Sequence, residues 1–197
     1  IEDGAVALVA LAKAAPADVG GTAVTGRDGD ADRLRRTLSE TDLLRISTHG
    51  TIAEGTNEVH LILAANGALP PSTIRGVGER HHNAHRMSWT ALEALDRAPG
   101  VVISTACNSG LVATPTGGER LGLERALFRA GSFCFVAPLW EMPIQAAQPL
   151  TLSLIEAILK SPETPVARHL WSVRRAARHE GLSPIAYAGL AAFGSMS

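Results

Sequence analysis

With 197 residues, of which 46% are apolar, the chain is long enough to bury one full hydrophobic core, and we expect a single domain over residues 1–197. Its formal net charge of −1 offers no field of one sign that would attract nucleic acid or an anionic membrane. No apolar run approaches the roughly 20 residues of a membrane span, and residues 1–15 lack the basic start of a signal peptide.

Hydrophobic periodicity and turn residues divide the chain into alternating strands and helices. In chain order, the pattern predicts a helix at 4–15, a strand at 20–25, a helix at 30–40, strands at 43–47 and 59–64, a helix at 89–97, a strand at 101–104, a helix at 119–130, a strand at 133–137, helices at 144–160 and 164–180, and a strand at 185–193. Asp30 is placed to cap the helix at 30–40. Residues 66–90 carry prolines, glycines and histidines without a clean period, and we expect an irregular insertion there.

Several of the predicted strands are continuously apolar, as at residues 101–104, which is typical of strands buried on both faces of a sheet. Strands that alternate with helices predict an α/β fold with a mainly parallel sheet and helices on both faces. Such sheets bind ligands beyond the carboxyl ends of their strands. His49 and Cys107 each follow the end of a predicted strand, so we expect the chemistry of the protein at that edge.

Cys107 is the candidate nucleophile, because the small residues at 108–110 would leave its sulfur exposed at a sharp strand end. His49 is the candidate base, since an imidazole with an ordinary pKa of about 6.5 can take or share the proton of a thiol near neutral pH. The backbone N–H groups of Gly50 and Cys107 could then form an oxyanion hole. The competing interpretation is that both side chains are ordinary structural residues. Cys134 has apolar neighbours on both sides and is expected to be such an inert thiol.

Five segments resemble those of one known family, in the same order along the chain. The family is that of CHAT domains, caspase-like peptidases that are often attached to TPR arrays. The segments are LLRISTHG at 43–50, STACNSG at 104–110, LGLERALFRAG at 121–131, VAPLW at 136–140 and YAGLAAFG at 187–194. Together they extend the resemblance over residues 30–194.

The resemblance implies a caspase-like three-layer sandwich and a cysteine endopeptidase that works through an acyl-enzyme, with His49 as base and Cys107 as nucleophile. It also implies a protein or peptide substrate and a regulatory sensor or TPR region that activates the domain, as in bacterial defence systems, some of them linked to CRISPR. Because the first residue is Ile1, we expect a fragment or excised part of a longer protein. We expect no cofactor, no bound metal, no direct contact with nucleic acid and no membrane association.

Thr105, Trp140 and Glu141 are the candidates for the substrate pocket. Related peptidases that cut after Arg or Lys commonly have a carboxylate two residues before the nucleophile. Thr105 at that position predicts a small or apolar P1 residue, because a neutral pocket would leave a charge unpaired. The family often has acidic residues after its Leu-Trp pair, whereas this chain has EMPI at 141–144, so its pocket departs from the family pattern more than the dyad does.

Two other functions stay open: a catalytically idle fold that serves as a protein-binding module, and a hydrolase or transferase that acts on a non-peptide acyl compound. The retained His49 and Cys107 favour the peptidase. The histidines at 81–85 lack further ligands and are interpreted as a solvated loop rather than a metal site. The basic residues of the helix at 164–180 are interpreted as a solvated face. Since a domain of this size needs no disulfide, we expect a reducing cytoplasm.

Overall fold

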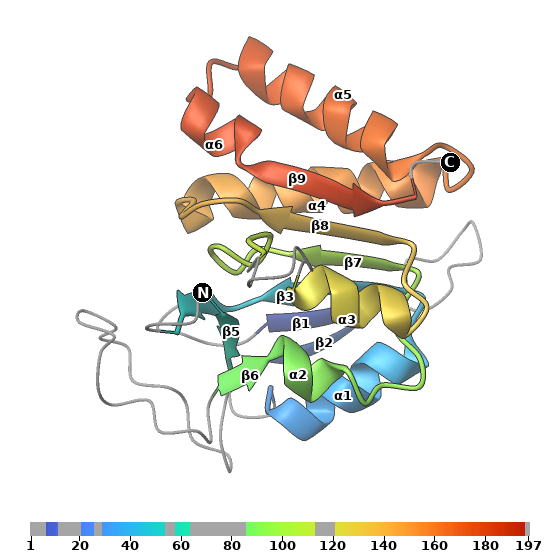
Figure 1. Ribbon diagram of the computed structural model, residues 1–197. Helices are drawn as coiled ribbons and strands as arrows, with labels where there is room; N and C mark the ends of the chain where they lie inside the picture. The colour runs from blue at the N-terminus through green and yellow to red at the C-terminus, as the bar shows by residue number, and fades with distance from the viewer. Residues whose placement is uncertain are drawn as a thin grey trace.

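The computed structural model describes residues 7–11, 21–25, 29–53, 58–63, 86–112 and 121–195. A six-stranded sheet has the order β2-β1-β3-β7-β8-β9, and a smaller sheet has the order β4-β5-β6 (Figure 1). The strands are β1 (Ala7–Leu11), β2 (Gly21–Thr25), β3 (Leu43–Ser47), β4 (His49–Ile52), β5 (Val59–Ile62), β6 (Arg86–Ser88), β7 (Val101–Ser104), β8 (Cys134–Pro138) and β9 (Leu190–Gly194). The helices are α1 (Ala31–Glu40), α2 (Trp89–Leu92), α3 (Leu123–Arg129), α4 (Ile144–Lys160), α5 (Val166–His179) and α6 (Pro184–Ala188).

The centre of the large sheet is parallel and its flanks are antiparallel. Strands β3, β7 and β8 run parallel to one another, whereas β1 is antiparallel to β2 and β3, and β9 is antiparallel to β8. Every residue of β3, β7 and β8 is buried, as the continuous apolar run of β7 predicts. In β3 this burial includes Arg45 and Ser47. The α/β fold with parallel strands is therefore confirmed at its centre, and the outer strands make the sheet mixed.

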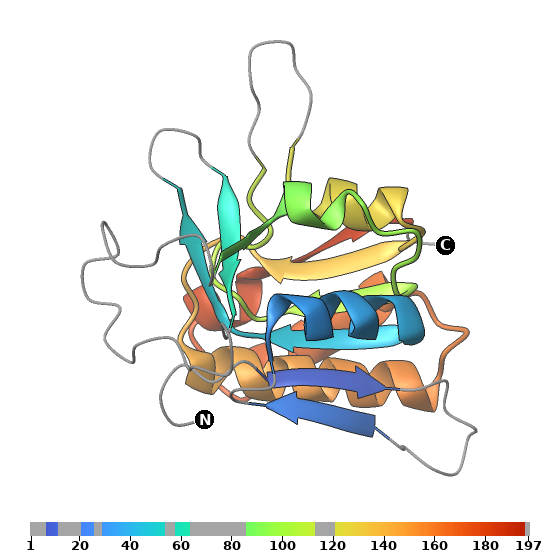
Figure 2. The ribbon, with the colours of Figure 1, turned by 90° about the horizontal axis from the view of Figure 1, so that it is seen from below.

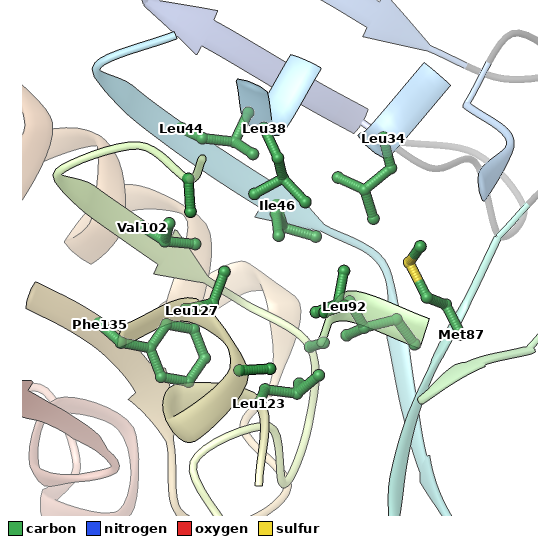
Figure 3. Packing of buried hydrophobic residues seen from close by; sticks show 14 of the residues in the cluster. Leu34, Leu38, Leu44, Ile46, Met87, Leu92, Val102, Leu123, Leu127 and Phe135 are labelled. Atoms are coloured by element: carbon green, nitrogen blue, oxygen red, sulfur yellow. The ribbon is translucent and has the colours of Figure 1, made fainter. Parts of the chain in front are cut away.

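Helices cover both faces of this sheet. Leu44 and Phe135 pack on one face, in a cluster that includes residues of α1, α2 and α3 (Figure 3). Leu43 and Val136 point to the other face and pack with α4 and α5, since successive strand residues alternate between faces. In Figure 2, α2 and α3 (green and yellow) accordingly lie on one side of the sheet, and α4 (orange) lies on the other.

The small sheet begins where β3 leaves the large one. β3 ends at Ser47 and β4 starts at His49, so the chain changes sheets at Thr48. The Thr48 hydroxyl donates to the carbonyl of Ile62 on β5, which fixes this change of direction. Leu61 and other buried residues of β5 and β6 join the same cluster as α1 and α3. The core thus holds the small sheet, and with it His49, against the carboxyl end of β3.

Two sequence predictions are wrong. The apolar run at 4–15 contains strand β1 rather than a helix, because β1 pairs along its whole length with β2 and β3, and these two ladders take up its backbone groups. The predicted strand at 185–193 begins as helix α6, and the chain enters β9 only at Leu190. Pro184 starts α6, since the first helical position needs no N–H.

The predicted bounds of the other elements agree more closely with the structure. The prediction at 144–160 coincides with α4 and that at 164–180 contains α5, whereas β4 was not expected. The helix predicted at 89–97 is shorter in the structure, because α2 ends at Leu92. Further along, the Arg97 side chain donates a hydrogen bond to the carbonyl of Ser39 at 2.8 Å. Of the insertion expected at 66–90, residues 86–90 belong to β6 and α2, and the remainder lies outside the described residues, as do the histidines at 81–85.

Asp30 caps α1 as predicted, because its carboxylate accepts a hydrogen bond from the backbone N–H of Arg33 at 2.7 Å. Asp30→Ala is expected to lower the free energy of unfolding by about 1 kcal/mol. Asp32→Ala is the matched control: the Asp32 side chain is 76% exposed and forms a surface ion pair with Arg35, which contributes less. Chemical denaturation measures both variants, and equal losses would contradict the cap.

Candidate functional site

Adjacent parallel strands carry His49 and Cys107 to the same edge of the sheet. β3 and β7 are neighbours, with Ile46 opposite Ser104. The pairing continues one residue further, because the backbone N–H of Thr105 donates to the carbonyl of Ile46 at 2.8 Å. His49 lies three residues beyond Ile46, and Cys107 lies three residues beyond Ser104. Since paired strands are about 4.8 Å apart, the two chain segments leave the sheet side by side.

Gly50 shows how closely these segments approach each other. A Cβ atom placed on Gly50 would lie 2.0 Å from the carbonyl oxygen of Cys107 and 3.2 Å from its backbone nitrogen. Real Cβ atoms do not approach backbone that closely, so this position requires glycine. The backbone on the C-terminal side of His49 therefore packs directly on the backbone of Cys107.

Hydrogen bonds hold the turn that presents Cys107. The buried Ser109 hydroxyl donates to Oγ of Ser104 at 2.8 Å, and the same Oγ accepts from the N–H of Ala106 at 3.1 Å. The N–H of Gly110 donates to the carbonyl of Pro138 at the end of β8, at 2.9 Å. Asn108 has a φ of 61°, a left-handed conformation that asparagine tolerates better than most residues. The turn is thus fixed to the end of its own strand β7 and to the neighbouring strand β8.

The Cys107 thiol is half-buried and its pKa is raised above the ordinary value. Burial is the main cause, because it disfavours the charged thiolate. Hydrogen bonding by the backbone of Met142 acts in the opposite direction and lowers the pKa, the nearby Glu141 carboxylate raises it, and the backbone of Cys107 itself lowers it. Burial therefore disfavours the thiolate form of this candidate nucleophile.

The His49 side chain is exposed at the start of β4. No hydrogen bond joins its ring to the Cys107 sulfur in the described part of the chain. The two residues are on adjacent segments, yet their side chains are not engaged. Catalytic hydrogen bonds are often long or poorly aligned before substrate binds, so this geometry is compatible with a dyad that closes later.

The three pocket candidates have different surroundings. Thr105 is 4% exposed, and its hydroxyl donates to Oγ of Ser47 at 3.0 Å, between β3 and β7. Trp140 is 37% exposed and donates from Nε1 to the carbonyl of Ile185 on α6 at 3.0 Å. Glu141 is exposed and close enough to the Cys107 thiol to act on its charge. Of these three, Glu141 is the one whose charge raises the pKa of Cys107.

Met142 is a site residue that the sequence did not indicate. Its side chain is 6% exposed, and its backbone lowers the pKa of the Cys107 thiol. The only available signal was its position just beyond the end of β8, at the same edge of the sheet as the dyad. That position does not distinguish it from its neighbours.

Cys134 contrasts with Cys107, as predicted. It is 2% exposed on β8, and burial raises its pKa to about 11. Neither cysteine forms a disulfide. A thiol reagent should therefore distinguish the two cysteines.

Glu141→Gln removes the negative charge that opposes the thiolate, so the pKa of Cys107 is expected to fall. A lower pKa means more thiolate at neutral pH, and alkylation of Cys107 by iodoacetamide should be about two- to fivefold faster, the size expected of an exposed charge pair. Glu163→Gln is the control, since Glu163 is exposed between α4 and α5. A pH profile of alkylation that stays in place, or moves to higher pH, would contradict the assignment of this carboxylate.

Two hollows lie away from this edge. One, of about 340 Å³, lies between α4 and α5, and the other, of about 630 Å³, lies between α3 and β9. Within the described ranges there is no group of three or more residues suited to hold a metal ion. None of the described helices is both long and apolar enough to cross a membrane.

The large sheet is thus an α/β sheet with parallel central strands, and a histidine and a cysteine lie beyond the ends of two adjacent ones. The chain matches the CHAT domain over residues 2–195 and belongs to that caspase-like family. This confirms the resemblance seen in the sequence. No curated protein matches the chain.

Proposed function

We propose that this domain is a cysteine endopeptidase in which Cys107 is the nucleophile and His49 the general base. The observation that carries this proposal is the close packing at Gly50, which sets the backbone beside His49 against the backbone of Cys107. The β3–β7 register supports it, because it brings both residues to the edge where such sheets bind ligands. Membership of the CHAT family supports the same assignment.

In the proposed reaction, His49 takes the proton of the thiol as Sγ attacks the carbonyl carbon of the scissile peptide bond. The carbonyl oxygen becomes an oxyanion, and the backbone N–H groups of Gly50 and Cys107 donate to it. The tetrahedral intermediate collapses when the C–N bond breaks, and His49 gives its proton to the leaving amine. Water, deprotonated by His49, then hydrolyses the thioester and restores the thiol.

The raised pKa of Cys107 and the unengaged His49 ring support a resting state that needs activation. A sensor or TPR region attached to the domain, in the same protein or complex, would close the dyad when it binds its signal. Such a regulated peptidase fits a role in bacterial defence, including CRISPR-linked systems, and a reducing cytoplasm would keep both thiols free. The same features would suit an idle protein-binding module, which is the alternative.

Thr105 carries no charge at the position where related peptidases that cut after Arg or Lys have a carboxylate, and this supports a small or apolar P1 residue. Its own hydroxyl is buried against Ser47. Glu141 points to the opposite preference, because an exposed carboxylate near the nucleophile attracts a basic side chain. Thr105 stands at the position that determines the P1 preference in related peptidases, so we retain the preference for a small or apolar P1 residue. The surrounding fold is proposed to be the three-layer sandwich of caspases, in keeping with helices on both faces of the sheet.

A fluorogenic peptide library with every residue in turn at P1, applied to the protein with its regulatory parts, tests this function. The expected result is hydrolysis after small or apolar residues that Cys107→Ala abolishes and Cys134→Ala preserves. Cleavage after Arg or Lys would show that Glu141, and not Thr105, determines the P1 preference. Hydrolysis that survives Cys107→Ala would overturn the proposed nucleophile.

A further inference from the structure

The segment between β8 and α4, residues 139–143, is fastened to α6 and to the residue that follows it. The backbone N–H of Leu139 donates to the carbonyl of Gly189 at 2.9 Å, and the indole N–H of Trp140 donates to the carbonyl of Ile185 at 3.0 Å. β8 and α6 meet at the same end of the sheet (Figure 1). Two successive residues of the segment are thus attached to one short helix and its end.

Gly189 adds a third attachment, through packing. A Cβ atom at this position would lie 2.5 Å from the sulfur of Met142 and 3.0 Å from Nε1 of Trp140. The absence of a side chain therefore lets both residues settle on the end of α6. Met142 is buried as a result. Its place is determined by α6 as much as by its own strand.

The same segment supplies the groups that act on the nucleophile. The N–H of Gly110, in the turn that carries Cys107, donates to the carbonyl of Pro138 just before the segment, at 2.9 Å. The backbone of Met142 lowers the pKa of the Cys107 thiol, and the Glu141 carboxylate raises it. The titratable side chains on the segments beside Cys107 include Glu141 in this segment and His49 at the start of β4. Their effects on the thiol therefore depend on where the segment is held.

We propose that Trp140 is a positioning residue, whose hydrogen bond to Ile185 holds the backbone of Met142 beside Cys107. This inference rests on the proposed function, because it concerns the nucleophile of that peptidase. It gives Trp140 a role in setting the state of the thiol, separate from any contact with substrate. The backbone of Met142 stabilises the thiolate, and the Glu141 carboxylate opposes it with a smaller effect.

Trp140→Phe tests the proposal, because it keeps an aromatic ring and removes the N–H donor. Loss of the anchor should move the pH profile of Cys107 alkylation by iodoacetamide to higher pH. At neutral pH the rate should fall about two- to tenfold, the size expected of one hydrogen bond. The matched control is Trp171→Phe, since Trp171 is 59% exposed on α5. Peptide mapping by mass spectrometry assigns the adduct to Cys107 or Cys134.

The Glu141→Gln background isolates the contribution of the amide. Without the carboxylate, Trp140→Phe should still move the profile to higher pH. A profile that superimposes on that of the parent, or that moves equally in Trp171→Phe, would overturn the proposal. A move to lower pH would also overturn it, because Trp140 would then serve mainly to hold the carboxylate.

Gly189→Ala provides a second variant if Trp140→Phe unfolds, as judged by its thermal transition. The added methyl group would press on the Met142 sulfur and should displace the segment, with the same direction of change in the profile. Small-molecule alkylation does not require peptide cleavage. If the protein cleaves no peptide but shows the predicted pH profiles of alkylation, the peptidase proposal is wrong and the positioning role of Trp140 stands.

Discussion

His49→Ala is expected to reduce peptide hydrolysis by roughly 10²–10⁴-fold in the activated protein, the contribution of a general base. Cys107→Ala should abolish it, since no acyl-enzyme can form without the sulfur. Both expectations follow from the adjacent strand ends of β3 and β7. Initial rates on one fluorogenic peptide, measured with the intact protein and its activator, give the comparison.

Controls separate chemistry from folding in this experiment. His179→Ala changes an exposed histidine at the end of α5, and Cys134→Ala changes the buried thiol of β8. Each should retain most of the activity. If His49→Ala hydrolyses the peptide at the parental rate while Cys107→Ala does not, another group serves as base, and the proposed dyad is wrong.

Gly50→Ala should damage the site more than any other single methyl group in the described structure. The new Cβ would lie 2.0 Å from the Cys107 carbonyl oxygen, which belongs to backbone and cannot rotate away. Overpacking of this kind costs about 1–3 kcal/mol, and for a domain of this size that lowers the thermal midpoint by about 2–12 °C. The contact is relieved when β4 moves away from Cys107. The rate of hydrolysis per folded molecule should therefore fall, in addition to the loss of thermal stability.

Gly181→Ala is the matched glycine control. Gly181 has a φ of +82° with nothing within 4 Å of its added Cβ, so alanine there is strained but meets no neighbour. That strain costs about 1–2 kcal/mol and should leave hydrolysis per folded molecule unchanged. If Gly50→Ala loses stability but keeps full activity, the close approach of β4 to Cys107 has no part in catalysis.

The sequence predicts the centre of this fold better than its edges. Strands such as β7 are continuously apolar because both faces are buried, and this can be read without knowing their partners. β1 is apolar too, but its strand form depends on pairing with β2 and β3, which lie elsewhere in the sequence. The local pattern at 4–15 suits a helix or a strand equally, and nonlocal pairing decides.

The candidate site divides in the same way. Cys107, His49 and Gly50 could be found because strand ends and small residues mark them in the sequence. The position of Met142 could not be predicted, since it packs on Gly189, which has no side chain and lies 47 positions further along the chain. The direction of the Thr105 hydroxyl also depends on residues far away in the sequence. It faces Ser47 on the neighbouring strand rather than a pocket.

The most direct test of the central claim is to treat the full-length protein with a peptidyl electrophile that traps thiol nucleophiles, with and without its activating signal, and to map the adduct by mass spectrometry. The account predicts an adduct on Cys107 that depends on His49 and increases with the signal, and none on the buried Cys134. The absence of any Cys107 adduct under both conditions would contradict the peptidase and favour a protein-binding module.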